Sequence, residues 1–299
     1  MRIAQVAPLD ESVPPRLYGG TERVIAYLTE ALVRQGHQVT LFASGDSETE
    51  AELVPCCASA LRLNPAMKDP LLYSIMQLEQ VRRRADEFDV LHFHGSPLFF
   101  PLAHALRHKT ITTLHGRLDL PDLDIFHAAF PGTPMVSISA AQRQPLPATS
   151  WVGTVPHGLP PDLLPFQPAA EAGYLAFLGR ISPEKRPDRA IEIAARGGMP
   201  LKIAAKIDDV NVSYWTDVIQ PIITRTPQVE FVGEINEAQK AAFLGDAAAL
   251  LFPIGWPEPF GLVMIEAMAC GTPVVAFRCG SVPGVDPVKP DTWRVATGP

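Results

Sequence analysis

The stretch YLAFLGRISPEKRPDRAIEIAARGGMPLKIAAK, residues 174–206, decides the fold class. Its apolar run 174–178 predicts a buried strand, residues 183–196 carry apolar side chains at helical spacing, and 201–206 is a second apolar run. A strand, a helix and a strand in this order form a βαβ unit, which builds a parallel sheet covered by helices. The sequence therefore predicts an α/β protein.

The same alternation continues along the rest of the chain. In the first half we expect strands at 2–7, 38–43, 90–93, 110–114, 135–138 and 151–155 and helices at 21–35 and 70–87. After residue 206 we expect helices at 212–224, 236–246 and 260–269 and strands at 229–232, 249–253 and 273–277. Between the halves, residues 156–173 contain five prolines, which prevent a helix or regular strand pairing. We predict two doubly wound domains, 1–165 and 166–299.

Composition excludes several classes of protein. The chain has 299 residues, 47% of them hydrophobic and 19% charged, which is typical of a globular protein and not of a disordered one. The net charge is 25 − 32 = −7 and no basic run occurs, so we expect no nucleic-acid partner. The four cysteines do not have zinc-ligand spacing and predict reduced thiols. No apolar stretch is long enough to be an integral membrane segment, and we expect a cytoplasmic protein.

A glycine pair lies between the first predicted strand and the first predicted helix, in Tyr18-Gly19-Gly20-Thr21-Glu22. Gly19 and Gly20 allow a close backbone approach, and the helix N-terminus behind them offers N–H groups to an anion or a sugar hydroxyl. The GxGxxG pattern of dinucleotide-binding proteins is absent. The alternative is a flexible loop at a helix start.

Two cations, Arg180 and Lys185, flank the loop between the strand 174–178 and the helix 183–196. Ser182 is expected to cap that helix and Pro183 to occupy its first position. Supported by the helix dipole, the two cations would form a clamp for a diphosphate. The alternative is that Lys185 is a solvated helix residue.

Two glutamates bracket a loop and a helix in the second half. Glu258 follows the strand 249–253, and Phe260, Gly261 and Leu262 present backbone N–H groups where the next helix begins. Glu266 falls on an otherwise apolar helix, where an unpaired carboxylate is costly and needs donors such as the two hydroxyls of a ribose. The alternative is a pair between Glu266 and a buried arginine.

Histidines follow two strands of the first half. His115 stands at the carboxyl end of the strand 110–114, where a side chain can face a ligand. His92 and His94 alternate on one strand, but no third ligand accompanies them, so we interpret them as core residues or as supports of the site rather than as metal ligands. The chain has no GxSxG, HExxH or P-loop motif, which argues against hydrolase and kinase functions.

Four ordered segments of the chain resemble the retaining glycosyltransferases of family 4, which have the GT-B fold. The most specific is the E-x7-E motif from Glu258 to Glu266 within EPFGLVMIEAMACGTPVVAF, and the others are FLGRISPEKRPDRAIEIA, VEFVGEI and YGGTERV. The resemblance covers nearly the whole chain to about residue 283. It implies two Rossmann-like domains facing a cleft, with the acceptor held mainly by 1–165 and a sugar nucleotide mainly by 166–299.

The resemblance also implies roles for particular residues. Arg180 and Lys185 would contact the diphosphate, Glu266 the ribose and Glu258 the donor-sugar hydroxyls. His115 would face the donor sugar. The remaining donor-binding candidates are Gly19, Gly20, Ser139, Lys206, Phe260, Gly261 and Leu262. The family uses no metal and no cofactor, because the two cations replace the magnesium ion and the nucleoside-diphosphate sugar is a substrate.

The function implied is retaining transfer of a hexosyl group from a nucleoside-diphosphate sugar to a hydroxyl of a sugar or lipid-linked acceptor, with transient contact at the inner face of the membrane. After Gly280-Ser281-Val282-Pro283 the chain departs from the family pattern. The tail has no amphipathic period, so we expect it to be coil and to lack one strand and the closing helices of the fold. The alternative function is therefore an inactive, truncated protein that binds sugar nucleotides without transfer.

Overall fold

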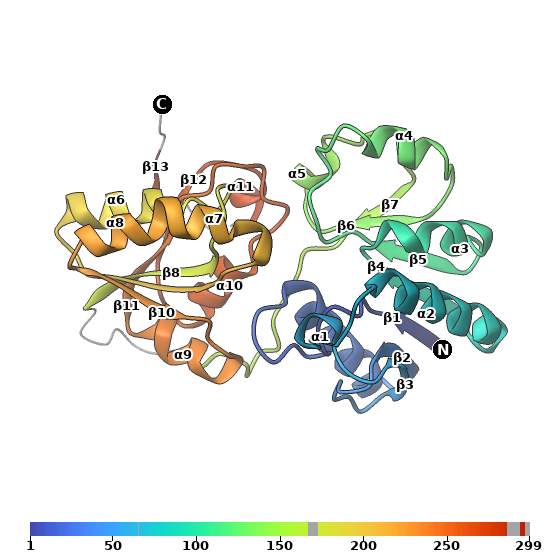
Figure 1. Cartoon of the computed structure of the whole chain (residues 1–299). Coiled ribbons are helices and arrows are strands. Elements are labelled where there is room, and N and C mark those ends of the chain that lie inside the picture. The colour runs from blue at the N-terminus through green and yellow to red at the C-terminus, as the bar shows by residue number, and fades with distance from the viewer. Residues whose placement is uncertain (65, 167–172, 286–293, 297–299) are drawn as a thin grey trace. The chain divides into compact units, whose positions relative to one another are not determined.

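The computed structural model describes residues 1–64, 66–166, 173–285 and 294–296. The chain divides into two compact units, Met1–His157 and Gly158–Pro299, and each contains its own parallel sheet (Figure 1). Both this division and the boundary expected at residue 165 fall within the proline-rich segment 156–168. The α/β class is therefore confirmed in each unit.

The first unit has a seven-stranded sheet in the order β3-β2-β1-β4-β5-β6-β7, with every pair parallel. This order, outward in both directions from β1, defines a doubly wound sheet. The strands are β1 (Arg2–Val6), β2 (Gln38–Ser44), β3 (Glu52–Cys57), β4 (Val90–His94), β5 (Thr110–Thr113), β6 (Met135–Ser137) and β7 (Trp151–Thr154). The edge strand β3 was not expected, because Pro55 interrupts its short apolar run and is tolerated only at a sheet edge.

Five α-helices connect the strands of the first unit among the described residues. They are α1 (Gly20–Arg34), α2 (Pro70–Arg84), α3 (Phe100–Ala105), α4 (Leu123–Ala128) and α5 (Ala140–Arg143). Asp69 caps α2 by accepting from the backbone N–H of Leu71. The last three helices have at most six residues each, too few to show a helical period in the sequence.

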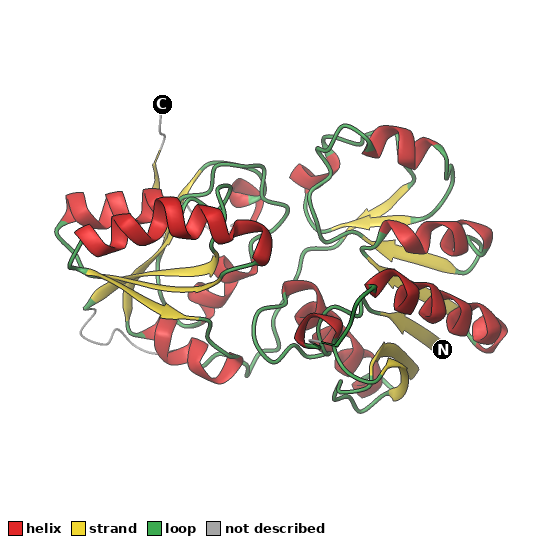
Figure 2. Cartoon of the chain, in the orientation of Figure 1, coloured by secondary structure: helices red, strands yellow, loops and turns green. Residues whose placement is uncertain are grey.

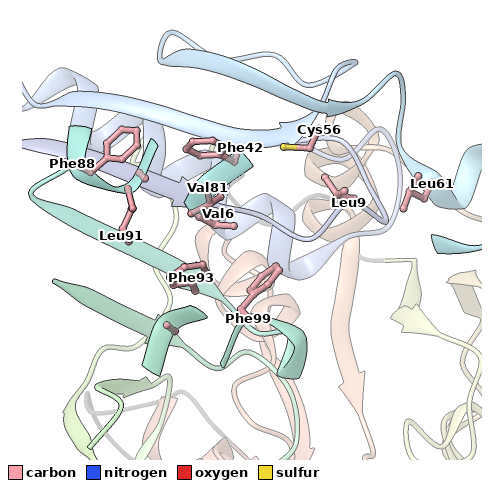
Figure 3. Packing of buried hydrophobic residues seen from close by; sticks show 13 residues of the cluster. Val6, Leu9, Phe42, Cys56, Leu61, Val81, Phe88, Leu91, Phe93 and Phe99 are labelled. Carbon is pink, nitrogen blue, oxygen red and sulfur yellow. The ribbon is translucent and has the colours of Figure 1, made fainter. Parts of the chain in front are cut away.

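One core cluster of the first unit lies between the sheet and α2. Figure 3 shows Val6, Phe42 and Phe93 from three adjacent strands meeting Val81 of α2. All four side chains are fully buried. Because burying one such side chain stabilises a fold by roughly 1.5–3 kcal/mol, this cluster holds α2 against the centre of the sheet.

The second unit has a six-stranded parallel sheet in the order β10-β9-β8-β11-β12-β13. Its strands are β8 (Tyr174–Arg180), β9 (Leu201–Lys206), β10 (Val229–Gly233), β11 (Ala247–Phe252), β12 (Val274–Phe277) and β13 (Arg294–Ala296). Alternate side chains of β8 point to opposite faces of the sheet: Leu175 and Phe177 pack in one cluster and Ala176 in another. A strand with both faces buried reads as a continuous apolar run, which is why this sheet was predictable.

Helices cover both faces of this sheet, α6 and α8 on one and α9 and α10 on the other (Figure 2). They are α6 (Pro187–Gly197), α7 (Val212–Tyr214), α8 (Gln220–Arg225), α9 (Glu237–Gly245), α10 (Leu262–Ala269) and α11 (Val282–Val285), and a π-helical turn, η5 (Trp215–Ile219), joins α7 to α8. Within the described ranges no helix is both long and apolar enough to cross a membrane.

Two expectations about the second unit are wrong. The helix expected to begin at Pro183 begins at Pro187, because Arg186 adopts a left-handed conformation with φ 55° at its N-cap. The tail expected to be coil contributes a strand: β13 pairs in parallel with β12, and α11 forms just before it. The rest of that expectation, on residues 286–293 and 297–299, lies outside the described residues.

All four cysteines are free thiols, as predicted. Cys56 and Cys270 are buried. Burial raises the pKa of Cys56 to about 12, so this thiol remains protonated at neutral pH.

Candidate functional site

Arg180, predicted to bind the diphosphate, and Lys206, a further donor-binding candidate, lie at the carboxyl edge of the second sheet. Arg180 is the last residue of β8 and Lys206 the last of β9, and the two are register partners. β11 lies on the other side of β8, and Glu258 belongs to the loop that follows it. Since parallel strands end at one edge, three adjacent strands bring these side chains together.

Acidic residues hold two of the cations in place. Asp208 bridges them: its Oδ1 lies 2.6 Å from Lys206 Nζ and its Oδ2 3.4 Å from Arg180 Nη1. Arg180 Nη2 also donates to Glu184 Oε1 at 2.9 Å. These ion pairs orient both cations and compensate part of their charge. Sequence reasoning missed Asp208, although an acidic residue two positions after a strand end was a visible signal.

Lys185 is paired with Glu258. Its Nζ donates to Glu258 Oε2 and lies 5.2 Å from the centre of the Trp256 ring. Trp256 Nε1 donates to the same oxygen at 2.9 Å. Glu258 is buried and accepts two hydrogen bonds, so the lysine and the glutamate of two separate motifs form one cluster.

The expected capping of a helix by Ser182 is wrong, and with it the helix dipole behind Lys185. Lys185 lies in a turn closed by its backbone N–H on Ser182 O at 3.1 Å, before α6 begins at Pro187. Charge at this position therefore comes from the lysine itself. The alternative of a solvated helix residue is equally wrong, because Lys185 pairs with buried Glu258.

Gly280 and Ser281 pack against the loop that carries Glu258 and fix its conformation. A Cβ at Gly280 would overlap the backbone of Glu258 and lie 2.7 Å from the carbonyl carbon of Pro257. Ser281 donates its backbone N–H to Glu258 O at 2.9 Å and its hydroxyl to Phe260 O at 2.7 Å. Only glycine permits this approach, so the loop's shape depends on a residue outside it.

Gly261 ends this loop and precedes α10, which begins at Leu262. Its φ of +82° favours glycine, and a Cβ there would lie 2.9 Å from Met264 Cε. Phe260 is buried. The structure therefore places Phe260, Gly261 and Leu262 at a helix start, as the sequence predicted.

Glu266 on α10 has a partner that the sequence analysis did not identify. Lys240 of α9 lies with its Nζ 2.5 Å from Glu266 Oε1 and 3.5 Å from Glu237 Oε2. Only 3% of Glu266 and 7% of Lys240 is exposed. Glu266 is therefore not an unpaired carboxylate, and its cation is a lysine rather than the arginine of the alternative. No local pattern relates residues 240 and 266, since α9 and α10 meet only in the folded unit.

The glycine and serine candidates of the first unit lie at helix starts. Gly19 is the N-cap of α1 and Gly20 its first residue, and a Cβ at Gly19 would lie 2.6 Å from Cβ of Pro15. Ser139 caps α5 by accepting from Gln142 N at 3.0 Å. The hydroxyl of Ser139 thus stabilises the start of α5.

His115 lies just after β5 and belongs to a group of hydrogen-bonded histidines. Its Nε2 is 3.0 Å from His94 Nδ1, and its Nδ1 is 3.4 Å from His157 Nε2. His92 bonds instead to Thr113 Oγ1 at 2.7 Å. His94, interpreted above as a core or supporting residue, contacts His115 directly.

Burial keeps these rings neutral. Desolvation lowers the pKa of His94 and of His115 well below the usual 6.5, and the pKa of His92 and of His157 to about 4. Within the described parts of the chain, no group of three or more His, Cys, Asp or Glu side chains is arranged to hold a metal ion.

Comparison with known proteins agrees with this architecture. A family model described as Glycosyltransferase Family 4 matches residues 18–191, and one described as Glycosyl transferases group 1 matches residues 224–285. The chain is 27% identical to the phosphatidyl-myo-inositol mannosyltransferase of Mycobacterium leprae, over 92% of this chain and 78% of that protein. It is 24% identical to an uncharacterized glycosyltransferase of Methanocaldococcus jannaschii, over 93% of this chain and 81% of that protein.

Solved structures share the fold. AviGT4, a glycosyltransferase involved in avilamycin A biosynthesis, superimposes with a TM-score of 0.72 at 25% identity, over 99% of this chain and 83% of that one. HepE of Anabaena, solved with UDP and glucose, superimposes with a TM-score of 0.71 at 18% identity, over 96% of this chain and 83% of that one. Two doubly wound units with these neighbours define a glycosyltransferase of the GT-B class. The chain belongs to Glycosyltransferase Family 4.

Proposed function

We propose that the chain is a retaining glycosyltransferase that moves a hexosyl group from a nucleoside-diphosphate sugar to a hydroxyl acceptor without a metal ion. The observation that carries the proposal is the position of Arg180 and Lys206 at the ends of adjacent strands, with Lys185, in the turn that follows Arg180, paired with Glu258. Departure of a nucleoside diphosphate builds negative charge on the leaving phosphate, and fixed cations stabilise that charge most strongly in the transition state.

In this proposal the diphosphate lies against Arg180 and Lys206. Asp208 and Glu184 hold the two cations before the donor arrives, so little reorganisation is needed when it binds. Lys185 contacts the same phosphates, and the backbone N–H groups of Phe260, Gly261 and Leu262 face the phosphate and the sugar. Three positive side chains take the place of a magnesium ion.

Glu258 orients the donor sugar by accepting from its hydroxyls, and it is not a nucleophile. Lys185 and Trp256 both donate to its Oε2, and such donors reduce the nucleophilicity of a carboxylate. Retaining glycosidases instead place two carboxyl groups about 5 Å apart, one as nucleophile and one as acid. We propose a same-face substitution in which the leaving phosphate accepts the proton of the acceptor hydroxyl.

Glu266 accepts from the ribose hydroxyls, with Lys240 neutralising its charge in the buried helix pair. His115 contacts the donor sugar, and Gly19, Gly20 and Ser139 belong to the donor site. The acceptor is a sugar or a lipid-linked hydroxyl. The hexosyl donor is supported by two relatives: the mycobacterial protein is a mannosyltransferase, and HepE was solved with UDP and glucose.

A panel of nucleoside-diphosphate sugars tests the proposal, read by thermal stabilisation and by release of nucleoside diphosphate, with and without sugar and lipid-linked acceptors. We expect one donor to stabilise the protein and to be consumed when the right acceptor is present. Stabilisation without release across all acceptors would support the alternative of a binding protein without transfer. A covalent glycosyl adduct trapped on Glu258 would contradict the same-face mechanism.

A further inference from the structure

Three imidazoles and one amide form a continuous hydrogen-bonded file inside the first unit. The side chain of Gln5 on β1 bonds to His94 on β4, His94 bonds to His115 after β5, and His115 bonds to His157. The distances are 2.7, 3.0 and 3.4 Å in that order. Gln5 and His94 are fully buried, so water cannot replace a partner at that end of the file.

We propose that this file determines which ring nitrogen of His115 carries its proton, which makes Gln5 and His94 positioning residues for His115. The orientation of the Gln5 amide sets the direction. Gln5 Oε1 is the atom that faces His94 Nε2, and a carbonyl oxygen only accepts, so Nε2 of His94 carries the proton.

The rest of the file follows from the chemistry of a neutral imidazole, which has one donor nitrogen and one acceptor nitrogen. With its proton on Nε2, His94 accepts at Nδ1 from His115 Nε2. His115 therefore carries its proton on Nε2 and has a lone pair on Nδ1, which accepts from His157 Nε2. If the Gln5 amide were rotated by 180°, its NH₂ group would donate to His94 Nε2, and donor and acceptor would exchange in every bond of the file. The experiment must distinguish these two arrangements.

The file ends at an amide, so it holds a tautomer and does not conduct protons. An amide neither releases nor takes up a proton near neutral pH, so a proton entering at His157 has no exit at Gln5. The consequence concerns the donor sugar and rests on the proposed contact of His115 with it. The weakest bond of the file, at 3.4 Å, is the one to His115 Nδ1. A sugar hydroxyl that donates its hydrogen can take that place, whereas a fluorine or hydrogen substituent cannot.

The decisive measurement is a long-range ¹H–¹⁵N correlation spectrum of the ¹⁵N-labelled full chain at neutral pH, in which nitrogen shifts identify the protonated nitrogen of each ring. Signals are assigned with His94→Asn and His115→Asn. We expect protons on Nε2 of His94 and of His115. A proton on Nδ1 of either ring would overturn the proposal. The spectrum needs no substrate, so this result is independent of whether the protein transfers a sugar.

Gln5→Leu tests the positioning role, because leucine has similar volume and accepts no hydrogen bond. We expect the His115 signal to become a mixture of tautomers and the turnover of the donor identified by the panel to fall about tenfold, the effect of one lost hydrogen bond. Affinity for the nucleoside diphosphate alone is expected to stay unchanged. An unchanged His115 tautomer in this variant, or unchanged turnover in spite of a changed tautomer, would overturn the positioning role.

Thr113→Val is the matched control. It removes the partner of His92, whose ring lies tilted beside that of His94 with centroids 4.1 Å apart but which contributes no bond to the file. We expect the His115 tautomer and the turnover to remain as in the unmodified chain. A tautomer change in Thr113→Val equal to that in Gln5→Leu would show a general packing effect and contradict the proposal.

Discussion

Asp208 forms ion pairs with two cations at once, Lys206 and Arg180. Lys206 and Arg180 share its two oxygens, while Lys185 is held separately by Glu258. Each of the three positive side chains is therefore held by a carboxylate. Loss of Lys206 or Arg180 leaves Asp208 with one cation instead of two, and loss of Lys185 leaves Glu258 with the Trp256 hydrogen bond.

Arg180→Ala and Lys185→Ala are each expected to lower turnover about a hundredfold, the usual effect of losing one preorganised donor at a developing negative charge. The measurement is the steady-state release of nucleoside diphosphate. Lys202→Ala is the control, because Lys202 lies on β9 with Lys206 but its Nζ lies over the Tyr174 ring, 4.3 Å from the ring centre. A loss below threefold in both test variants would count against the clamp.

The buried Lys240–Glu266 pair is expected to contribute to the free energy of unfolding. Lys240→Met leaves a buried carboxylate without its cation, and breaking such a pair costs about 3–5 kcal/mol in the free energy of unfolding. The double variant Lys240→Met with Glu266→Met replaces both charges by apolar groups and is expected to recover most of that loss. Urea unfolding measures both. A single variant as stable as the unmodified chain would contradict the buried pair.

At the scale of an element, the loop 257–260 depends on Gly280. Gly280→Ala is expected to shift the Glu258 backbone and to weaken donor binding at least tenfold, because backbone atoms cannot yield as a flexible side chain does. Isothermal titration with the donor measures the effect. Gly284→Ala is the control, since a Cβ at Gly284 would contact nothing within 4 Å. Equal affinities in the two variants would remove the proposed role of Gly280.

The histidines of β4 and of the following loops make stability depend on pH. In the unfolded chain a histidine has a pKa near 6.5, whereas burial lowers the pKa of His92 and of His157 to about 4 in the fold. Between these values the unfolded state binds more protons, so stability is complete above pH 6.5 and falls as the pH drops toward 4.

The slope reaches at most about 1.4 kcal/mol per pH unit for each such histidine. His92→Phe is expected to show a shallower loss of unfolding free energy between pH 6.5 and pH 4.5 than the unmodified chain. Denaturant unfolding at a series of pH values gives both curves. Parallel curves would show that His92 does not contribute to this dependence.

Across the whole molecule, the sequence predicted the elements that are long enough to show a hydrophobic period. The βαβ alternation identified nearly every strand of both sheets, including β8, β9 and β11, whose order places the strand ends of Arg180 and Lys206 beside each other. Short elements such as α3 and α4 were missed because a single turn has no period. The start of α6 was misplaced because Pro183 and Pro187 both suit a first helical position, and the left-handed Arg186 selected the second.

The partners of the site residues were less predictable, because they come from distant parts of the chain. Lys240 lies 26 positions from Glu266, and Gln5 lies 89 positions from His94. Only the packing of α9 on α10 and the pairing of β1 with β4 bring these residues together. Motifs identified the candidate site residues, and the fold was needed to find the residues that contact them.

The most direct test of the central claim is ¹H NMR of the anomeric proton of donor and product during turnover of the sugar nucleotide in buffer containing EDTA. We expect release of nucleoside diphosphate and a product whose anomeric configuration equals that of the donor, at a rate unaffected by the chelator. A product of inverted configuration, or turnover that stops until a divalent metal is added, would contradict it.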